Sequence, residues 1–134
     1  MGITELDGIV YIICSNAVYA YSSQTLLSQN RKPITGTGSL SDIAASVVNK
    51  RLYVADNGVN TLWRVNVTYN GYFVGKFASC CYGAVTYQPH KLSVAADGRI
   101  FVCTDGGNQL FIYNPDSTML RTVDMSAFSV FNTR

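Results

Sequence analysis

The sequence predicts an all-β protein built from three repeated, four-stranded antiparallel units. Two short apolar runs joined by a polar link occur three times in the 134 residues, and the first run begins at Val10, Leu52 and Ile100. These starts are 42 and 48 residues apart, and no stretch of ten residues has the 3.6-residue period of an amphipathic helix. Repeats of this length made only of strands are typical of the blades of a β-propeller, so we expect three blades.

In each repeat the innermost strand precedes the first apolar run. It is predicted over 42–48 in the second repeat, before a turn at Asn49-Lys50, and over 91–96 in the third, before Asp97-Gly98. Asp-Gly is a strong hairpin signal because both residues tolerate a positive φ. In the first repeat we match Gly2–Leu6 to Leu92–Ala96, which places an innermost strand at the start of the sequence.

The other three strands of each repeat follow in chain order. The first apolar run forms the second strand, and the run that ends at Val65 or Tyr113 forms the third. Outermost strands are expected over 72–78 and 119–125, after turns at Asn70-Gly71 and Asn114-Pro115-Asp116. These elements predict one domain with blades over about 1–39, 40–88 and 89–128, and a segment, 129–134, that leads to the next blade.

Two kinds of residue recur at matching positions of the repeats. Tyr19, Trp63 and Phe111 share one column, and a bulky aromatic once per blade is expected to fill the space between blades in preference to stacking on a ligand. Asp56 and Asp105 both follow the second strand, where a carboxylate accepts backbone N–H bonds within a turn. We therefore assign structural roles to all five.

The composition narrows the range of functions. The chain is 48% hydrophobic and only 13% charged, which indicates that it buries more surface than one small domain needs. A net charge of +2 is too mild to indicate nucleic acid binding by itself. No apolar run reaches the length of a membrane span and no signal peptide opens the sequence, so we expect no membrane partner, and the compartment is not indicated.

The four cysteines do not have the spacing of a metal site. Cys14 and Cys103 lie inside apolar runs, where we expect them to be buried as small hydrophobes. Cys80 and Cys81 precede the single histidine, His90, in a loop-like stretch, without the paired C-x-x-C spacing that zinc sites use. The Asn-Val-Thr sequence at 66–68 has the form of a glycosylation sequon, and its use is left open.

One repeat has the pattern of a known family. Residues 52–65 read LYVADNGVNTLWRV, which resembles the NHL repeat, and residues 97–125 resemble it as well, from Asp-Gly to the Asn-Pro-Asp turn. The first repeat is similar more loosely, and together the matches cover nearly the whole chain. The resemblance implies half of a propeller of the NHL or gluconolactonase type, which usually has six blades. Its members include protein-binding, RNA-binding and hydrolytic proteins, so the resemblance implies a fold and not a function.

Three blades alone would expose two blade faces rich in apolar side chains. Because the sequence begins within an innermost strand and ends near where another should begin, we expect two copies placed head to tail to close a six-bladed ring. Such a homodimer is a C2 arrangement in which each blade face meets its complement. The alternative is that this sequence is a fragment of a longer chain that supplies the remaining blades.

A divalent metal in the central channel is the main catalytic hypothesis. Asp42 and His90 both lie ten residues before the start of a second strand, and Glu5 lies in the first repeat. Carboxylate and imidazole groups there would suit an ion that activates water or polarises a carbonyl. The resemblance to gluconolactonase-like hydrolases implies Glu, Asn and Asp ligands, which this sequence does not match. We therefore expect no cofactor, with a divalent metal as the alternative.

A non-catalytic binding or scaffold module is the function that the sequence favours, because it requires no special residues. The first alternative is a metal-dependent hydrolase of the lactonase or esterase type. The second is RNA binding of the NHL type, to which five scattered basic residues could contribute. They are Arg31, Lys32, Lys50, Arg51 and Lys91.

Overall fold

The protein consists of three antiparallel four-stranded sheets, each a simple meander. The computed structural model describes residues 2–14, 16–22, 28–33, 39–68, 71–79, 88–105 and 109–125, and these residues contain strands and turns but no helix that could cross a membrane. The strands are β1 (Gly2–Leu6), β2 (Ile9–Cys14), β3 (Ala17–Ser22), β4 (Ser28–Pro33), β5 (Leu40–Ser46), β6 (Arg51–Asp56), β7 (Thr61–Thr68), β8 (Gly71–Ser79), β9 (Gln88–Val94), β10 (Ile100–Asp105), β11 (Gln109–Tyr113) and β12 (Met119–Asp124).

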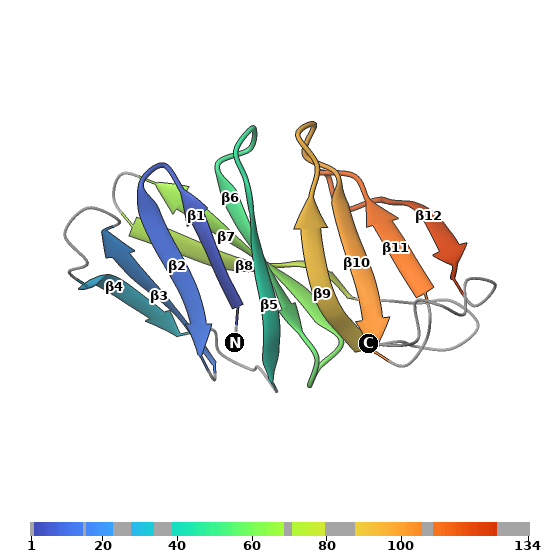
Figure 1. The fold of residues 1–134 in the computed structure, drawn as a ribbon, viewed down its shortest axis with the longest axis horizontal. Helices are drawn as coiled ribbons and strands as arrows, with labels where there is room; N and C mark the ends of the chain where they lie inside the picture. Colours follow the sequence, from blue (N-terminus) through green and yellow to red (C-terminus); the bar gives the residue numbers. More distant parts are fainter. Residues whose placement is uncertain are drawn as a thin grey trace.

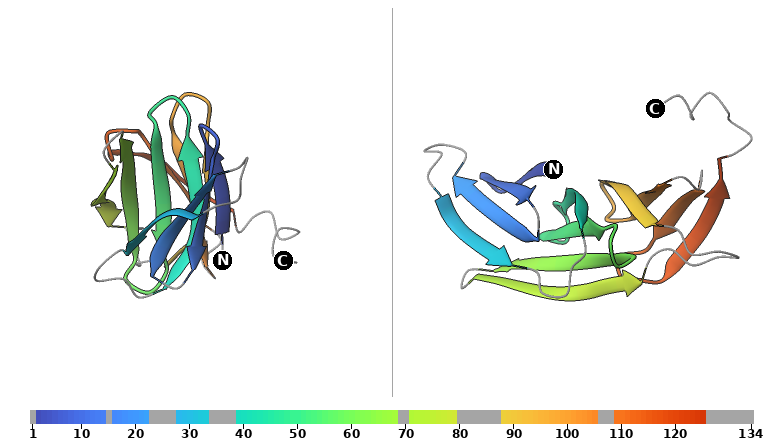
Figure 2. Two further views of the ribbon diagram at one scale, coloured as in Figure 1. Left: turned by 90° about the vertical axis from the view of Figure 1, so that its left-hand side faces the viewer. Right: turned by 90° about the horizontal axis from the view of Figure 1, so that it is seen from below.

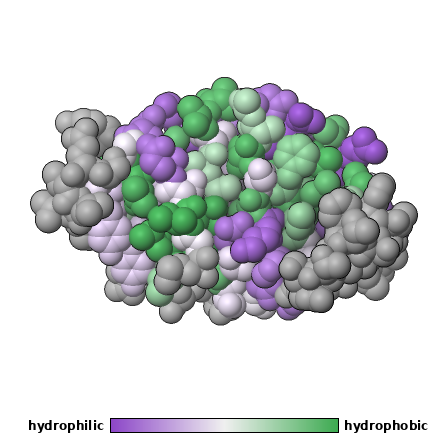
Figure 3. All heavy atoms as spheres, in the orientation of Figure 1, coloured by the Kyte–Doolittle hydropathy of each residue, from purple (hydrophilic) through white to green (hydrophobic). Residues whose placement is uncertain are grey.

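The three sheets are arranged as neighbouring blades of a propeller. Blade 1 is β1 to β4, blade 2 is β5 to β8 and blade 3 is β9 to β12, with the strands of each blade hydrogen-bonded in chain order. The innermost strands β1, β5 and β9 stand side by side on the concave side of the arc, and β4, β8 and β12 form its convex side (Figures 1 and 2). On the concave face, apolar residues lie over the inner strands, between patches of hydrophilic residues (Figure 3). The prediction of an all-β, three-bladed partial propeller is confirmed.

The predicted strands exist, and two of the innermost strands, β5 and β9, begin earlier than predicted. β5 covers 40–46 and β9 covers 88–94, instead of 42–48 and 91–96. β5 ends earlier than predicted because Val47 and Val48, which have strand propensity, lie in the β5–β6 turn with 67% and 60% of their surfaces exposed. The fourth strand expected in blade 1 is β4, and the sequence did not indicate its position because this polar segment has no apolar pattern.

The apolar core lies between blades. Two clusters of buried side chains form it, one at the interface of blades 1 and 2 and one at the interface of blades 2 and 3. β6 contributes to both clusters, because Leu52 and Val54 face blade 1 whereas Tyr53 and Ala55 face blade 3. Burying a side chain such as Leu52 stabilises the fold by roughly 1.5–3 kcal/mol, so the blades depend on each other for stability.

The pairing registers show which residues of the blades are equivalent. The second strand of each blade pairs with the innermost strand through Glu5–Val10, Ala45–Leu52 and Val94–Ile100, separations of 5, 7 and 6 residues. The equivalent of Leu92 in blade 1 is therefore Ile3, and the match of Gly2–Leu6 to Leu92–Ala96 is wrong by one residue. Because successive strand residues alternate faces, this slip exchanges the two faces of β1.

The turns at one end of the blades explain the different separations. Asp7 and Gly8 form a two-residue turn in which both have positive φ, 52° and 83°. At Asp97-Gly98 only Gly98 has positive φ, 93°, because Gly98 N–H donates to Ala95 O and Ala95 N–H to Arg99 O in a longer turn. The turn at 114–118 has the same two hydrogen bonds, with Ser117 at the glycine position and φ 77°.

Two of the cysteines are less buried than predicted. Cys14 ends β2 and Cys103 lies on β10, and both are exposed free thiols. Cys103 belongs to the face of blade 3 that has no neighbour, which explains its exposure despite its apolar surroundings. Cys80 and Cys81 lie outside the described residues.

We expect substitutions at the two equivalent turn positions to act in opposite directions. Ser117→Gly should raise the free energy of unfolding by about 0.5–1 kcal/mol, because glycine relieves the strain of a positive φ. Gly98→Ala should lower it by about 1–3 kcal/mol, because the new Cβ adds backbone strain and would lie 2.6 Å from Asn49 Nδ2. Denaturant unfolding measures both, and a Gly98→Ala variant as stable as the wild type would contradict this account.

Candidate functional site

Asp42 joins the innermost strands of two blades. Its Oδ1 accepts a hydrogen bond from the backbone N–H of Ile43 (2.9 Å), and its Oδ2 accepts one from the backbone N–H of Leu92 on β9 (2.8 Å). In blade 1 the equivalent residue is Gly2, and a Cβ there would lie 2.9 Å from Asp42 Oδ1. Both residues therefore fix the close approach of one innermost strand to the next.

The three candidate metal ligands are not brought together. Glu5 is exposed on β1 and accepts a hydrogen bond from the backbone N–H of Gly8, and His90 is exposed on β9. Among the described residues, no three His, Cys, Asp or Glu side chains lie close enough to hold a metal ion. The register explains part of this, because Asp42 pairs with Ala55 and its equivalent in blade 3 is Lys91, not His90.

Asp56 is a buried carboxylate that organises one turn. It has no exposed surface, and its Oδ1 accepts hydrogen bonds from the backbone N–H groups of Ser39 (3.0 Å) and Gly58 (3.1 Å). Its Oδ2 accepts one from Trp63 Nε1 (3.0 Å). The residue thus connects the segment that enters β5 to the β6–β7 turn and to β7. The expected match with Asp105 is wrong by one residue, because the pairing registers make Thr104 the equivalent of Asp56 in blade 3. The side chain of Asp105 lies outside the described residues.

The aromatic column points from each blade toward the preceding one. Trp63 packs at the interface of blades 1 and 2, and Phe111, which is 1% exposed, packs between blades 2 and 3. Tyr19 is the equivalent residue of blade 1, as its pairing with Ile12 shows, and it is half-buried on a face with no preceding blade. The three rings therefore lie at different interfaces and do not form one ligand-stacking surface.

Within the described part of the chain, two blade faces have no neighbouring blade, and we call them the leading face of blade 1 and the trailing face of blade 3. On the leading face Ile3 is 65% exposed, whereas its equivalent in blade 2, Ile43, is 3% exposed. On the trailing face Phe101 is half-buried, whereas its equivalent Tyr53 is fully buried. Positions that are buried at the internal interfaces are thus exposed or only half-buried on the two outer faces.

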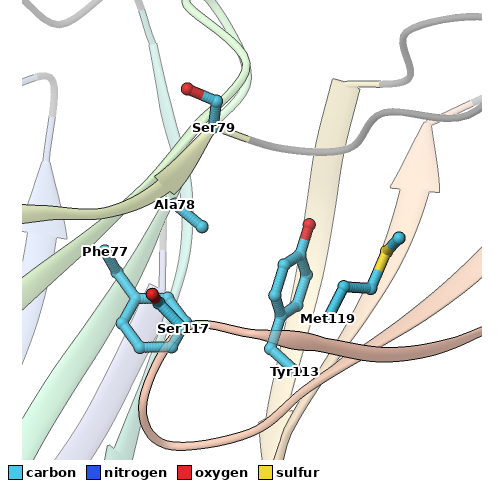
Figure 4. A pocket seen from close by; sticks show the side chains of 6 residues that line it. All are labelled: Phe77, Ala78, Ser79, Tyr113, Ser117 and Met119. Carbon is cyan, nitrogen blue, oxygen red and sulfur yellow. The ribbon is translucent and has the colours of Figure 1, made fainter.

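An apolar hollow of about 340 Å³ lies at the convex side between blades 2 and 3 (Figure 4). The ring of Phe77 makes edge contacts with the rings of Tyr53 (5.0 Å between centroids) and Tyr113 (6.2 Å). Burial raises the pKa of the Tyr113 phenol to about 12. The hollow is lined by Phe77, Ala78, Ser79, Tyr113, Ser117 and Met119.

A second hollow, of about 410 Å³, lies beside the first and shares Phe77 and Ser117 with it. Three cationic side chains line it, from Arg51 on β6, Arg64 on β7 and Lys76 on β8. Of these three residues, the sequence indicated only Arg51, as one of five basic residues that could contribute to RNA binding. Arg64 could have been noticed, because it interrupts an apolar run at the position where the other blades have Ala20 and Ile112.

Replacing the buried Asp56 carboxylate should destabilise the protein. Asp56→Asn keeps the shape of the side chain but turns one acceptor into a donor that faces N–H groups, so we expect a loss of about 2–4 kcal/mol in the free energy of unfolding. Denaturant unfolding gives the value. Asp97→Asn, a change at an exposed turn carboxylate, is the control, and an equal effect of both changes would contradict the role of Asp56.

The stability of the protein should fall at alkaline pH partly through Tyr113. Because the pKa of this phenol is raised from 10.0 to about 12, the folded state retains its proton where the unfolded state loses it. This stabilisation is complete below about pH 10 and is lost as the pH rises from about 10 to about 12. We expect Tyr113→Phe to unfold with a shallower pH dependence in this range, and identical slopes for the two proteins would refute this.

Solved structures with the same fold are found at low sequence identity. The chain is similar to virginiamycin B lyase from Staphylococcus aureus (TM-score 0.72, 17% identity, 92% of this chain and 40% of the other). It is also similar to luciferin-regenerating enzyme (TM-score 0.67, 13% identity, 88% and 43%) and to a protein from Lactobacillus plantarum (TM-score 0.66, 15% identity, 92% and 40%). No protein-family model and no curated protein sequence matches the chain. The chain therefore has a propeller fold and spans about 40% of the length of the structures that it resembles.

Proposed function

We propose that the chain is a non-catalytic binding and scaffold module that becomes a complete propeller by joining further blades through its two open faces. The observation that carries the proposal is the exposure of Ile3, at 65%, in a column whose other members are the buried Ile43 and the half-buried Leu92. An apolar column that is covered at every internal interface is expected to be covered at the ends of the array as well.

The two internal interfaces support the choice of occupant. At each of them the trailing face of one blade packs on the leading face of the next, as Tyr53 and Ala55 of blade 2 do on Ile100 and Val102 of blade 3. The two faces left open are one trailing face and one leading face, which are the complementary pair. A second copy of the chain, placed head to tail, would supply both partners and close a ring of six blades.

The charges on the open faces also favour pairing between copies. Glu5 is exposed on the leading face of blade 1, at the position where the other blades have Ala45 and Val94. Lys91 is exposed on β9, at the position of Asp42 on the trailing side of blade 2. In a head-to-tail dimer, a carboxylate of one copy and an ammonium of the other would therefore belong to the same interface, twice per ring.

The proposed blade type is that of the NHL repeat. Support comes from residues 52–56, Leu-Tyr-Val-Ala-Asp, and from the structural role of the Asp56 that ends this run. By their shares of coverage, the similar solved structures are long enough for about six or seven blades of this size, within the usual range of four to eight. The number of blades in the closed ring is therefore the quantity that a mass measurement would determine.

Metal-dependent hydrolysis is the second candidate, because two of the similar structures are named as enzymes. For this chain it would require ligands beyond Glu5, Asp42 and His90, which are separate. Titration with Ca²⁺ or Zn²⁺ tests it directly, since a stoichiometric site that raises the melting temperature would favour this candidate over a purely structural module.

A charge-exchange experiment tests closure by a second copy. Light scattering on a sizing column should give twice 14.6 kDa for the wild type. Glu5→Lys and Lys91→Glu should each weaken the dimer by roughly tenfold or more, because each change places like charges together, and the double variant should recover most of the affinity. Lys50→Gln, at an exposed turn outside both faces, is the control.

The outcomes separate closure from misfolding. Thermal melting of each variant shows whether its blades remain folded, so a monomeric but folded single variant that the second change rescues supports the proposal. A wild-type protein that stays monomeric and folded at all concentrations refutes it.

A further inference from the structure

We propose that the hollow between blades 2 and 3 binds a small organic phosphate, with the phosphate group held by Arg51, Arg64 and Lys76 and the apolar body in the adjoining hollow. This inference is independent of ring closure, because every residue involved lies within one chain. The hollow that would hold the phosphate extends from the β5–β6 turn across β6 and β7 to β8, and the β11–β12 turn lines its other side.

One sheet and one turn build the cationic hollow. β6, β7 and β8 of blade 2 each supply one cation, and the β11–β12 turn of blade 3 covers them. Arg64 pairs with Tyr53 on one side and with Gly75 on the other, so it stands on the trailing side of blade 2. Arg64 Nη2 lies 3.4 Å from where a Cβ of Gly75 would be, so the guanidinium rests beside a residue without a side chain.

Several donors that line this hollow have no acceptor among the described residues. Within the described part of the chain, neither the two arginines nor Lys76 forms an ion pair, in contrast to Lys50 with Asp7 and Arg99 with Asp97. The Arg64 Nε and Asn49 Nδ2 atoms are buried, and neither has a hydrogen-bond partner among the described residues. Buried donors are normally satisfied, so an acceptor is expected to enter the hollow.

Among the described residues that line the hollow, Asp116 is the only carboxylate, and one of its oxygens already accepts two hydrogen bonds. Asp116 Oδ1 accepts hydrogen bonds from the backbone N–H and the hydroxyl of Thr118 (3.0 and 2.6 Å), and these bonds lower the pKa of Asp116. Three cations against one anion leave a net charge of about +2. A dianionic phosphate monoester would neutralise this charge and could accept from planar guanidinium groups in pairs.

The adjoining hollow favours an organic phosphate over the free ion. Phe77 and Ser117 line both hollows, and beyond them the surface is formed by Tyr113, Met119 and Ala78 (Figure 4). Each hollow has a volume of a few hundred Å³, about 410 and 340 Å³, which suits a small molecule and is too small for a macromolecule. The ligand class is therefore a phosphate monoester with an aromatic or short aliphatic body.

Calorimetric titration with phenyl phosphate and with inorganic phosphate, at low ionic strength and pH 7.5, tests the proposal. We expect one site per chain and a roughly tenfold preference for phenyl phosphate, because only this probe reaches the apolar hollow. Arg64→Gln should weaken binding by roughly tenfold or more, Lys76→Gln by a smaller factor, and Asp116→Asn should strengthen it about threefold, because it removes a repulsive charge.

Arg99→Gln is the matched control. Arg99 is the blade 3 equivalent of Arg51, but it forms an ion pair with Asp97 (2.9 Å). This change should leave the affinity unchanged. If Arg64→Gln fails to fold, the affinities of Lys76→Gln and Asp116→Asn for phenyl phosphate still test the proposal, because both residues are exposed. A rise in the wild-type melting temperature with phenyl phosphate that Lys76→Gln reduces would support the site.

Three results would overturn the proposal. One is the absence of phosphate binding, and another is binding that neither Lys76→Gln nor Arg64→Gln weakens. The third is single-stranded RNA that binds through the same residues with a steep salt dependence while phenyl phosphate does not. Equal affinity for the two phosphate probes would overturn the role of the apolar hollow.

Discussion

The packing of one blade on the next is the constraint on which the rest of the structure depends. A four-stranded meander has two faces and no interior, so its apolar side chains are buried only when another sheet covers them. β6 illustrates this, because alternate residues from Leu52 to Ala55 belong to two different clusters. The middle blade is covered on both faces and contains the largest run of fully buried residues. The outer blades are each covered on one face, and their exposed apolar residues follow directly from this arrangement.

The sequence was sufficient to predict the architecture because the apolar runs record this packing directly. A residue of the second strand is buried by whichever neighbour it faces, so the runs from Leu52 and Ile100 are apolar without interruption and are easily matched. The column of Tyr19, Trp63 and Phe111 follows from the same alignment, and the pairing registers place the three residues at equivalent positions. The strands could thus be predicted from the sequence wherever apolar side chains face a neighbouring blade.

The innermost strands were harder to place, because their register depends on turn geometry that composition does not reveal. The same dipeptide, Asp-Gly, makes a two-residue turn at Asp7-Gly8 and part of a longer turn at Asp97-Gly98. A difference of one residue there reverses which side chains of β1 face blade 2. For the same reason, counting ten residues back from the second strand paired Asp42 with His90, whereas the sheets make Lys91 its equivalent. Asp42 and His90 were chosen as candidate metal ligands because of that count.

The polar residues that organise the interfaces were the least predictable part of the molecule. Asp56 was expected to accept backbone hydrogen bonds in its turn, but its contacts with Ser39 and Trp63 join segments that the sequence does not show to be close. Arg64 carries a charge within an apolar run, and only the fold reveals that it meets Arg51 and Lys76 from neighbouring strands. Chemistry of this kind depends on which strands are adjacent, and three side chains far apart in sequence become neighbours only in the folded sheet.

The two junctions between successive innermost strands use different residues, Gly2 between β1 and β5 and Asp42 between β5 and β9, and the equivalent residue of blade 3 is Lys91. A blade that follows Gly2 must tolerate very close contact, whereas a blade that follows Asp42 must present a free backbone N–H. The blades are therefore built alike but are not interchangeable, and each junction accepts its own successor. Because swapping of similar modules is a characteristic failure of repeat proteins, we expect junctions that differ from one another to oppose the exchange of one blade for another.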